Sequence, residues 1–184
     1  MKTWKTLLLL AYIIIFFWSG KPYEWLALPP ADPFICALRP EPDPVQEPPR
    51  HKVPEEYRDM FTDAAASAGI PLWALESVAY IETGFNPGAM SAPREDGNCD
   101  LGMMQFNSKY LEWYARRYNG AEPFDPLDPG EAIPIAAKHL SFLYDHYGTW
   151  ADACLAYNAG IGAVDRDEIP ESSYQYLIKF YEGY

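Results

Sequence analysis

The chain has 184 residues, of which 49% are hydrophobic, and it carries a formal net charge of -12. This apolar fraction excludes a disordered chain, and the acidity, with no basic stripe along the sequence, argues against nucleic-acid binding. The three cysteines and three histidines show neither CxxC nor Cys/His zinc spacing, so we expect no metal and no other cofactor.

Residues 1–20 have the pattern of a targeting segment. Lys2 and Lys5 precede an unbroken apolar run of 12 residues at 7–18, which is typical of a signal peptide and short for a membrane span of roughly 20 residues. Bulky residues at 16–18 replace the small residues that a signal peptidase prefers, so an uncleaved membrane anchor is the alternative. In both cases we expect the rest of the chain to be exported, in the periplasm or attached to the cell envelope.

Residues 21–54 form a proline-rich linker that contains ten of the 18 prolines. Because proline lacks a backbone N–H, this segment fits neither a helix nor a central strand. It is typical of an extended, semi-rigid spacer. One domain at 55–184 follows, and its roughly 130 residues are enough for a sizeable core.

The domain has the start and stop signals of helices. We expect three glycines to be helix C-caps: Gly69, Gly84 and Gly148. Ser108 is the expected N-cap of the third helix. The segment 85–107, rich in Gly, Asn, Asp and Pro, indicates loops or a small β element. The sequence therefore predicts a mainly α domain with helices at 55–68, 72–83, 109–118, 129–147, 150–158 and 171–181.

Cys99 and Cys154 leave the disulfide state open. In an oxidising compartment these two can pair and leave Cys36 free. The alternative is three free thiols. Sequence alone does not show whether two Cα atoms come within bonding range, so both alternatives stand.

Glu82 lies on the apolar face of the predicted helix 72–83. Leu75 and Glu82 are two turns apart and fall within about 20° of one another around the axis, whereas Glu76 points roughly 120° away, toward expected solvent. An apolar surrounding and the negative end of the helix dipole both raise the pKa of a carboxyl group. A general acid that works near neutral pH needs this environment. Helical position alone equally fits an exposed glutamate at a frayed helix end.

Three sequence blocks surround and follow Glu82. They read Glu-Thr-Gly-Phe-Asn-Pro at 82–87, Asp-Leu-Gly-Met-Met-Gln-Phe-Asn at 100–107 and Ala-Tyr-Asn-Ala-Gly at 156–160. In this order they resemble the lytic transglycosylases of the soluble-lytic-transglycosylase (SLT) type, which have a lysozyme-like fold. The resemblance covers roughly residues 68–165 and is closest to small members that open gaps in the cell wall for secretion or conjugation machinery.

The resemblance implies a single catalytic acid/base, Glu82. It would protonate the oxygen that links N-acetylmuramic acid (MurNAc) to N-acetylglucosamine (GlcNAc) in peptidoglycan strands. It would then take the proton of the muramoyl 6-hydroxyl as that oxygen attacks the anomeric carbon. The product is a 1,6-anhydro sugar and no water is consumed, so the second carboxylate of ordinary glycosidases is not required.

The resemblance also implies a set of substrate-binding residues. Ser91 matches a hydroxyl near the substrate, Gln105 a sugar-binding amide, and Tyr157 a tyrosine that hydrogen-bonds near the acid and positions it. Asn158 belongs to a turn that shapes the cleft floor. Met104 packs either against a sugar face or in the core.

The chain departs from the family pattern at three places. Thr83 replaces the usual Ser after the acid, and Met103 replaces Leu in the second block. Residues 91–100 form a longer polar stretch than the commonest members have. None of these changes removes a chemically necessary group.

Two alternative functions remain open from the sequence. Asp96 or Asp100 as a second carboxylate would make the enzyme a lysozyme-like hydrolase, although turn chemistry explains both residues. A non-catalytic glycan-binding module is the other alternative. The expected partners are peptidoglycan strands and an envelope-spanning secretion or appendage machinery.

Overall fold

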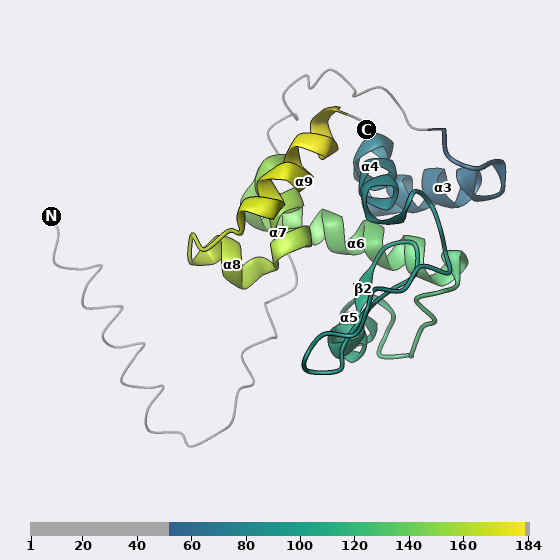
Figure 1. Cartoon of the computed structure of the whole chain (residues 1–184). Helices are drawn as coiled ribbons and strands as arrows, with labels where there is room; N and C mark the ends of the chain where they lie inside the picture. The colour runs from purple at the N-terminus through teal and green to yellow at the C-terminus, as the bar shows by residue number, and fades with distance from the viewer. Residues whose placement is uncertain (1–51, 183–184) are drawn as a thin grey trace, which may run out of the picture. The chain divides into compact units, whose positions relative to one another are not determined.

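The structure is a computed structural model that describes residues 52–182 (Figure 1). The expected targeting segment at 1–20, nearly all of the linker and Cys36 lie outside the described residues. Within 52–182, no helix has both the length and the apolar character that crossing a bilayer requires.

Helices dominate the described part of the chain, and one small sheet accompanies them. In chain order the elements are η1 (Glu55–Tyr57), α3 (Arg58–Ala68), α4 (Leu72–Thr83), β1 (Asp100–Leu101), β2 (Phe106–Asn107), η2 (Ser108–Tyr110), α5 (Leu111–Tyr118), α6 (Pro129–Tyr147), α7 (Trp150–Ala159), α8 (Ile161–Asp165) and α9 (Glu171–Glu182). The predicted mainly α domain is therefore confirmed.

Local capping chemistry sets most helix ends where the sequence predicts them. Gly69, Gly84 and Gly148 adopt left-handed conformations after α3, α4 and α6, which glycine tolerates without a steric cost. Asp128 and Thr149 accept backbone N–H bonds at the starts of α6 and α7. As a result, α4 and α6 cover the predicted residues without any shift.

The start of the third predicted helix differs from expectation. The side chain of Asn107, not Ser108, accepts the N–H of Lys109. Ser108 Oγ instead accepts the N–H of Cys99 at 3.1 Å. The first turn is consequently the 3-10 helix η2, and α8 is an additional short helix that the sequence did not indicate.

The segment 85–107 contains the small β element that the sequence predicts. β1 and β2 pair antiparallel, with Asp100 opposite Asn107 and Leu101 opposite Phe106. Met90 adds an isolated bridge to Leu101. This hairpin carries the second sequence block next to the C-terminal end of α4.

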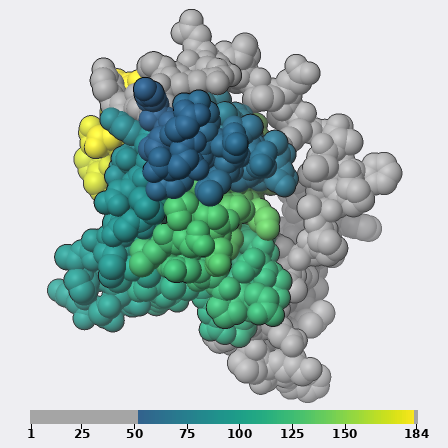
Figure 2. All heavy atoms as spheres, turned by 90° about the vertical axis from the view of Figure 1, so that its right-hand side faces the viewer, coloured from purple at the N-terminus to yellow at the C-terminus, as the bar shows by residue number. Residues whose placement is uncertain are grey.

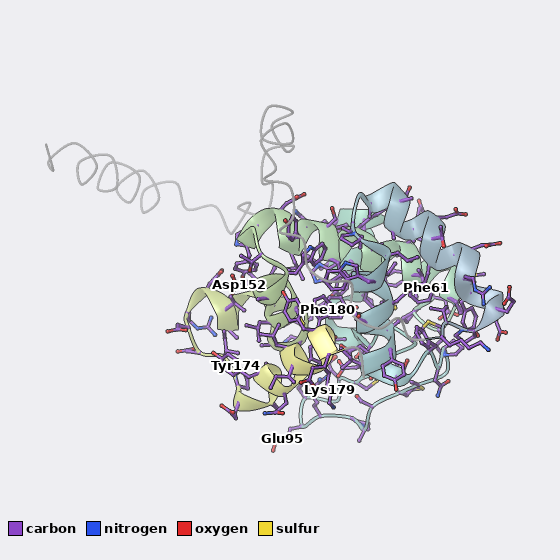
Figure 3. All side chains as sticks on the ribbon, turned by 90° about the horizontal axis from the view of Figure 1, so that it is seen from above. Phe61, Glu95, Asp152, Tyr174, Lys179 and Phe180 are labelled. Atoms are coloured by element: carbon purple, nitrogen blue, oxygen red, sulfur yellow. The ribbon has the colours of Figure 1, made fainter. Side chains whose placement is uncertain are left out.

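Helix α4 is central to the core and packs against α3, α6 and α9 (Figure 1). All seven residues from Trp73 to Ala79 are buried. Phe180 of α9, labelled in Figure 3, is fully buried, and its ring lies 5.2 Å from that of Trp73. The last helix of the chain is thereby fixed on α4.

The predicted solvent exposure of Glu76 is wrong. Its side chain is 7% exposed. The prediction assumed that α4 has one apolar face and one wet face, as a surface helix does. A helix covered on all sides buries whatever residues it carries, polar ones included.

The two cysteines of the described chain are not bonded to each other. Cys154 is fully buried on α7, and burial raises the pKa of its thiol well above the ordinary value. Cys99 lies in the segment before β1, where its backbone is fixed by Ser108. The structure therefore has free thiols at both positions.

Gly102 is the glycine of the second block that the fold strictly requires. Its φ is +74°, and a Cβ there would lie 1.8 Å from the carbonyl oxygen of Pro126. We predict that Gly102→Ala destabilises the domain by about 1–3 kcal/mol through steric overlap, in addition to backbone strain. The measurement is urea unfolding.

A matched control isolates the steric part of this loss. Gly84 also has a positive φ, +62°, but a Cβ there meets no atom within 4 Å. Gly84→Ala should therefore cost only the backbone strain, about 1–2 kcal/mol. Equal losses in the two variants would contradict the role assigned to the Pro126 contact.

Candidate active site

Glu82 is a half-buried carboxyl in the last turn of α4. Its Oε1 accepts a hydrogen bond from the Tyr176 hydroxyl at 2.8 Å. The pKa of Glu82 is raised from 4.5 to about 7, chiefly by burial; the Tyr176 hydrogen bond lowers it, and the negative charge of Asp100 raises it further. At neutral pH this group is therefore able both to give and to take a proton.

Tyr176 is a site residue that the sequence analysis missed. It lies on α9, 94 positions after Glu82, and is buried. Burial raises the pKa of Tyr176 well above its ordinary value, and the nearby Glu82 adds to this, so the phenol stays protonated as a donor. The available signal was its position: Ser173, Tyr176 and Phe180 form the buried face of α9, and a buried tyrosine hydroxyl needs a partner.

Thr83 connects the end of α4 to the second sequence block. Its Oγ1 donates to the carbonyl of Met103 at 3.0 Å and accepts the N–H of Asn86 at 3.1 Å. The hydroxyl group is what these contacts use, so the replacement of Ser by Thr preserves the chemistry. Thr83 thus ties the end of α4 to the second block and to the turn at Asn86.

Tyr157 forms a hydrogen bond near the acid, and its partner is a backbone carbonyl and not Glu82 itself. Its hydroxyl donates to the carbonyl oxygen of Met104 at 2.9 Å, whereas the hydrogen bond to Glu82 comes from Tyr176. Tyr157 nevertheless lies close enough to Glu82 for that charge to raise its pKa, after burial as the main cause. Tyr157 therefore ties α7 to the second block near the acid.

Met104 packs in the core and not against a sugar. Its side chain is 0% exposed, so the sugar-facing alternative is wrong. The reason is that the turn between β1 and β2 directs this side chain inward and leaves its carbonyl to Tyr157. The methionines of this block thus act through backbone carbonyl groups.

Gln105 occupies a constrained turn beside the site. Its φ of 51° is left-handed, which is uncommon for residues other than glycine. Its side-chain amide nitrogen donates to the carbonyl oxygen of Gly102 at 2.8 Å and lies 3.5 Å from the carbonyl oxygen of Ala89. Strained backbone of this kind is often found at functional sites, and the predicted contact of Gln105 with sugar stays a prediction.

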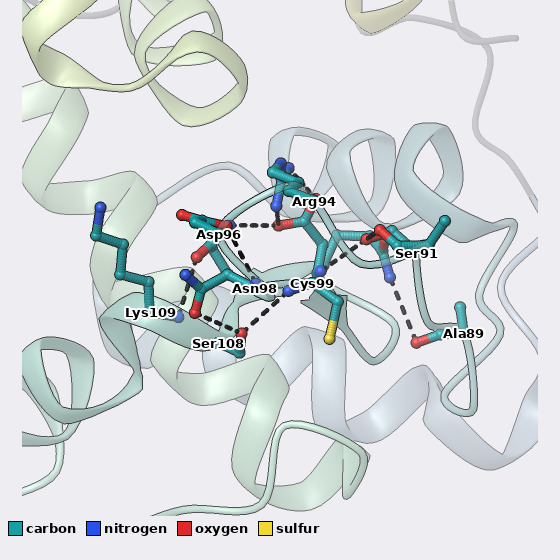
Figure 4. Close-up of polar contacts among 12 residues, drawn as sticks. Ala89, Ser91, Arg94, Asp96, Asn98, Cys99, Ser108 and Lys109 are labelled. Carbon is teal, nitrogen blue, oxygen red and sulfur yellow. Dashed lines mark hydrogen bonds and ion pairs between the residues drawn. The ribbon is translucent and has the colours of Figure 1, made fainter.

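Ser91, labelled in Figure 4, is paired with Asp100 of β1 through two hydrogen bonds. Ser91 Oγ accepts the backbone N–H of Asp100 at 2.8 Å, and the Ser91 N–H bonds the Asp100 carbonyl at 3.0 Å. The Asp100 carboxylate accepts from both terminal nitrogens of Arg94 and from Asn107 at 3.0 Å. Both carboxylate oxygens of Asp100 therefore already accept hydrogen bonds.

Neither remaining candidate carboxylate is placed as a partner for Glu82. Asp96 is exposed and accepts the Asn98 N–H at 3.1 Å, and these hydrogen bonds with Asn98 lower its pKa. This is ordinary turn chemistry, while Asp100 is occupied by Arg94 and Asn107. Asn158, at the end of α7, is exposed.

The site contains one acid/base group and no grouping suited to a metal. Among residues 52–182, no cluster of three or more His, Cys, Asp or Glu side chains is arranged to hold an ion. The chemistry that the geometry supports is proton transfer by Glu82, with Tyr176 as hydrogen-bond donor.

Comparison with known proteins agrees with this geometry. The model of the transglycosylase SLT domain matches residues 59–176. The chain is 34% identical over 118 residues to peptidoglycan transglycosylase gp16 of Escherichia phage T7, which covers 64% of this chain and 9% of that protein. It is 30% identical over 128 residues to invasion protein IagB of Salmonella typhimurium, which covers 70% of this chain and 76% of that protein.

Solved structures show the same fold. The 70 kDa soluble lytic transglycosylase from Escherichia coli matches with a TM-score of 0.59 and 23% identity, over 68% of this chain and 23% of that chain. The expected lysozyme-like fold is thus confirmed. Because the family model matches more than half of the sequence, the chain belongs to the transglycosylase SLT domain family.

Proposed function

We propose that this chain is a peptidoglycan lytic transglycosylase that cleaves the MurNAc–GlcNAc β-1,4 bond without water and leaves 1,6-anhydroMurNAc ends. The observation that carries the proposal is Glu82, a carboxyl group with a pKa of about 7; the two candidate second carboxylates in the described chain, Asp96 and Asp100, are hydrogen-bonded to other residues. Family membership and a relative named peptidoglycan transglycosylase support it. That relative is much longer, since the match spans 9% of its length.

The proposed mechanism uses Glu82 twice. The protonated carboxyl donates its proton to the glycosidic oxygen as the bond from that oxygen to the MurNAc anomeric carbon breaks. The carboxylate then accepts the proton of the 6-hydroxyl as that oxygen bonds to the anomeric carbon. Glu82 ends protonated as it began, and the Tyr176 hydroxyl, 2.8 Å away, stabilises the intervening carboxylate.

We further propose that the domain works outside the cytoplasm, next to envelope-spanning secretion or appendage machinery. The apolar segment at 1–20, as a signal peptide or an anchor, and the proline-rich spacer support this location. The match to a relative named invasion protein, over 76% of its length, supports the association with such machinery.

Glu82→Gln should reduce the release of soluble fragments from purified sacculi by about 10²–10⁴-fold, because the amide cannot transfer a proton. Mass spectrometry of the wild-type digest should show 1,6-anhydromuropeptides. Glu95→Gln is the control, since Glu95 projects to solvent from the loop at 91–100 (Figure 3) and its loss should leave release unchanged.

Three results would contradict this assignment. Retained turnover in Glu82→Gln would show that Glu82 is not the catalytic acid. Products with reducing ends alone would indicate a hydrolase, and binding to sacculi with no fragment release by the wild type would indicate a glycan-binding module.

Tyr176→Phe should shift the alkaline limb of the pH profile of kcat/KM to higher pH. The reaction requires protonated Glu82, so activity falls as pH rises through its pKa of about 7. The Tyr176 hydrogen bond lowers that pKa, and its removal should raise it. Tyr174→Phe, on the exposed side of the same helix, should leave the limb in place. A limb that stays fixed or moves to lower pH in Tyr176→Phe contradicts the role of this bond.

Glu82 should also make the stability of the domain depend on pH. Its pKa is 4.5 when unperturbed and about 7 when folded, so its stabilising effect is complete below pH 4.5 and is lost as pH rises through 7. The loss amounts to about 3 kcal/mol at most. The free energy of unfolding in urea should therefore change less between pH 5 and pH 8 for Glu82→Gln than for the wild type. An equal change in the two proteins would contradict the raised pKa of Glu82.

A further inference from the structure

A pocket lies away from the Glu82 site, where the ends of α3 and α5 meet α6. Its volume is about 430 Å³, and it is open to solvent. Figure 2 shows α3 and α6 in contact on one face of the domain. The lining that matters chemically consists of Arg117 and Tyr118 from α5 and Lys138, Ser141 and Phe142 from α6. None of these residues belongs to the catalytic site.

Arg117 is held in a fixed position in this pocket by aromatic rings. Its guanidinium carbon lies 4.0 Å from the centre of the Phe142 ring and 5.8 Å from the rings of Trp113 and Tyr118. Stacking of this kind orients the planar group without using its N–H donors. Apart from the donor that reaches the Tyr118 hydroxyl, the N–H groups are left for an acceptor in the plane of the guanidinium.

The hydrogen-bonding of Arg117 is incomplete. Its Nε is buried and has no hydrogen-bond partner, while the guanidinium also hydrogen-bonds the Tyr118 side chain. A buried donor left without an acceptor typically costs about 1–3 kcal/mol. The neighbouring Arg116, by contrast, is exposed and is paired with Glu112.

Two further groups define what the pocket accepts. Lys138 Nζ donates to the carbonyl of Tyr118 at 2.9 Å, which uses one of its three protons. Asp145 is the one acidic residue of the lining, so the two cations Arg117 and Lys138 leave the lining with a net positive charge. The positive charge of Arg117 also acts on the buried His139, whose pKa is lowered to about 3, mainly by burial and then by Arg117. The pocket therefore favours an anion.

We propose that this pocket binds a carboxylate of the peptide stems that peptidoglycan carries. A carboxylate matches the planar fork of Arg117, with Lys138 as a second cation. The volume of about 430 Å³ suits a few peptide residues and not a folded partner. The inference rests on the proposed function, since it assumes peptidoglycan as the substrate, and it adds a contact to the peptide far from the bond that is cleaved.

The test uses the full chain and a sugar-free stem peptide, so that contacts between glycan and the Glu82 site do not contribute to the measured affinity. Calorimetric titration should show saturable binding by the wild type. Arg117→Gln should weaken it about 10–100-fold, which is the worth of a charged hydrogen bond. Arg116→Gln removes the same charge one residue away on the same helix and should bind as the wild type does. Arg117→Lys keeps the charge without the fork and should also bind more weakly.

The other outcomes would overturn the proposal. These are no binding by the wild type, equal binding by wild type and Arg117→Gln, unchanged binding of a peptide with all its carboxyl groups amidated, or equally tight binding of a triglutamate peptide or inorganic phosphate. Melting curves of each variant separate lost binding from lost folding.

This result is independent of the catalytic test. Peptide binding that depends on Arg117, together with sacculus digests that lack anhydro ends, would contradict the proposed function alone. Anhydro ends without peptide binding would contradict the pocket proposal alone.

Discussion

The hydrogen bond from Tyr176 to Glu82 is the interaction on which the site depends. It joins the end of α4 to α9, the last helix of the described chain, and two opposing effects on the acid meet there. Burial raises the pKa of Glu82 and the phenol lowers it. Anything that loosens α9, such as loss of the Phe180 contact with Trp73, therefore alters the acid as well as the fold.

The second sequence block works mainly as a junction. The carbonyl of Met103 accepts from Thr83, and that of Met104 accepts from Tyr157. Both methionine side chains are fully buried, while Gly102 lets the chain pass against Pro126. The block thus joins α4, α7 and the hairpin through backbone groups. Its methionine side chains pack in the core, and their carbonyls position the groups around the acid.

Local signals predict this fold well, and distant contacts explain what they miss. The ends of α4 and α6 follow from glycine and Asp caps that act within a few residues. The burial of Glu76 and the role of Tyr176 depend on elements far away in sequence, which periodicity does not show. Glu82 was identified by its surrounding sequence blocks, because helical spacing alone fits an exposed glutamate equally well.

Asp100 is the carboxylate whose charge acts on Glu82, and its contacts bear on whether the proposed reaction uses one carboxyl group or two. A hydrolase needs a second carboxylate that is free to activate water or to contact the sugar. Asp100 is near enough to raise the pKa of Glu82, yet Arg94 and Asn107 occupy its oxygens. Arg94 comes from the long polar stretch at 91–100, so this departure from the family pattern supplies the group that engages Asp100. Asp100 thereby keeps its electrostatic effect on Glu82 while its carboxylate is held by Arg94 and Asn107, which agrees with the proposal that the 6-hydroxyl of the substrate is the attacking group.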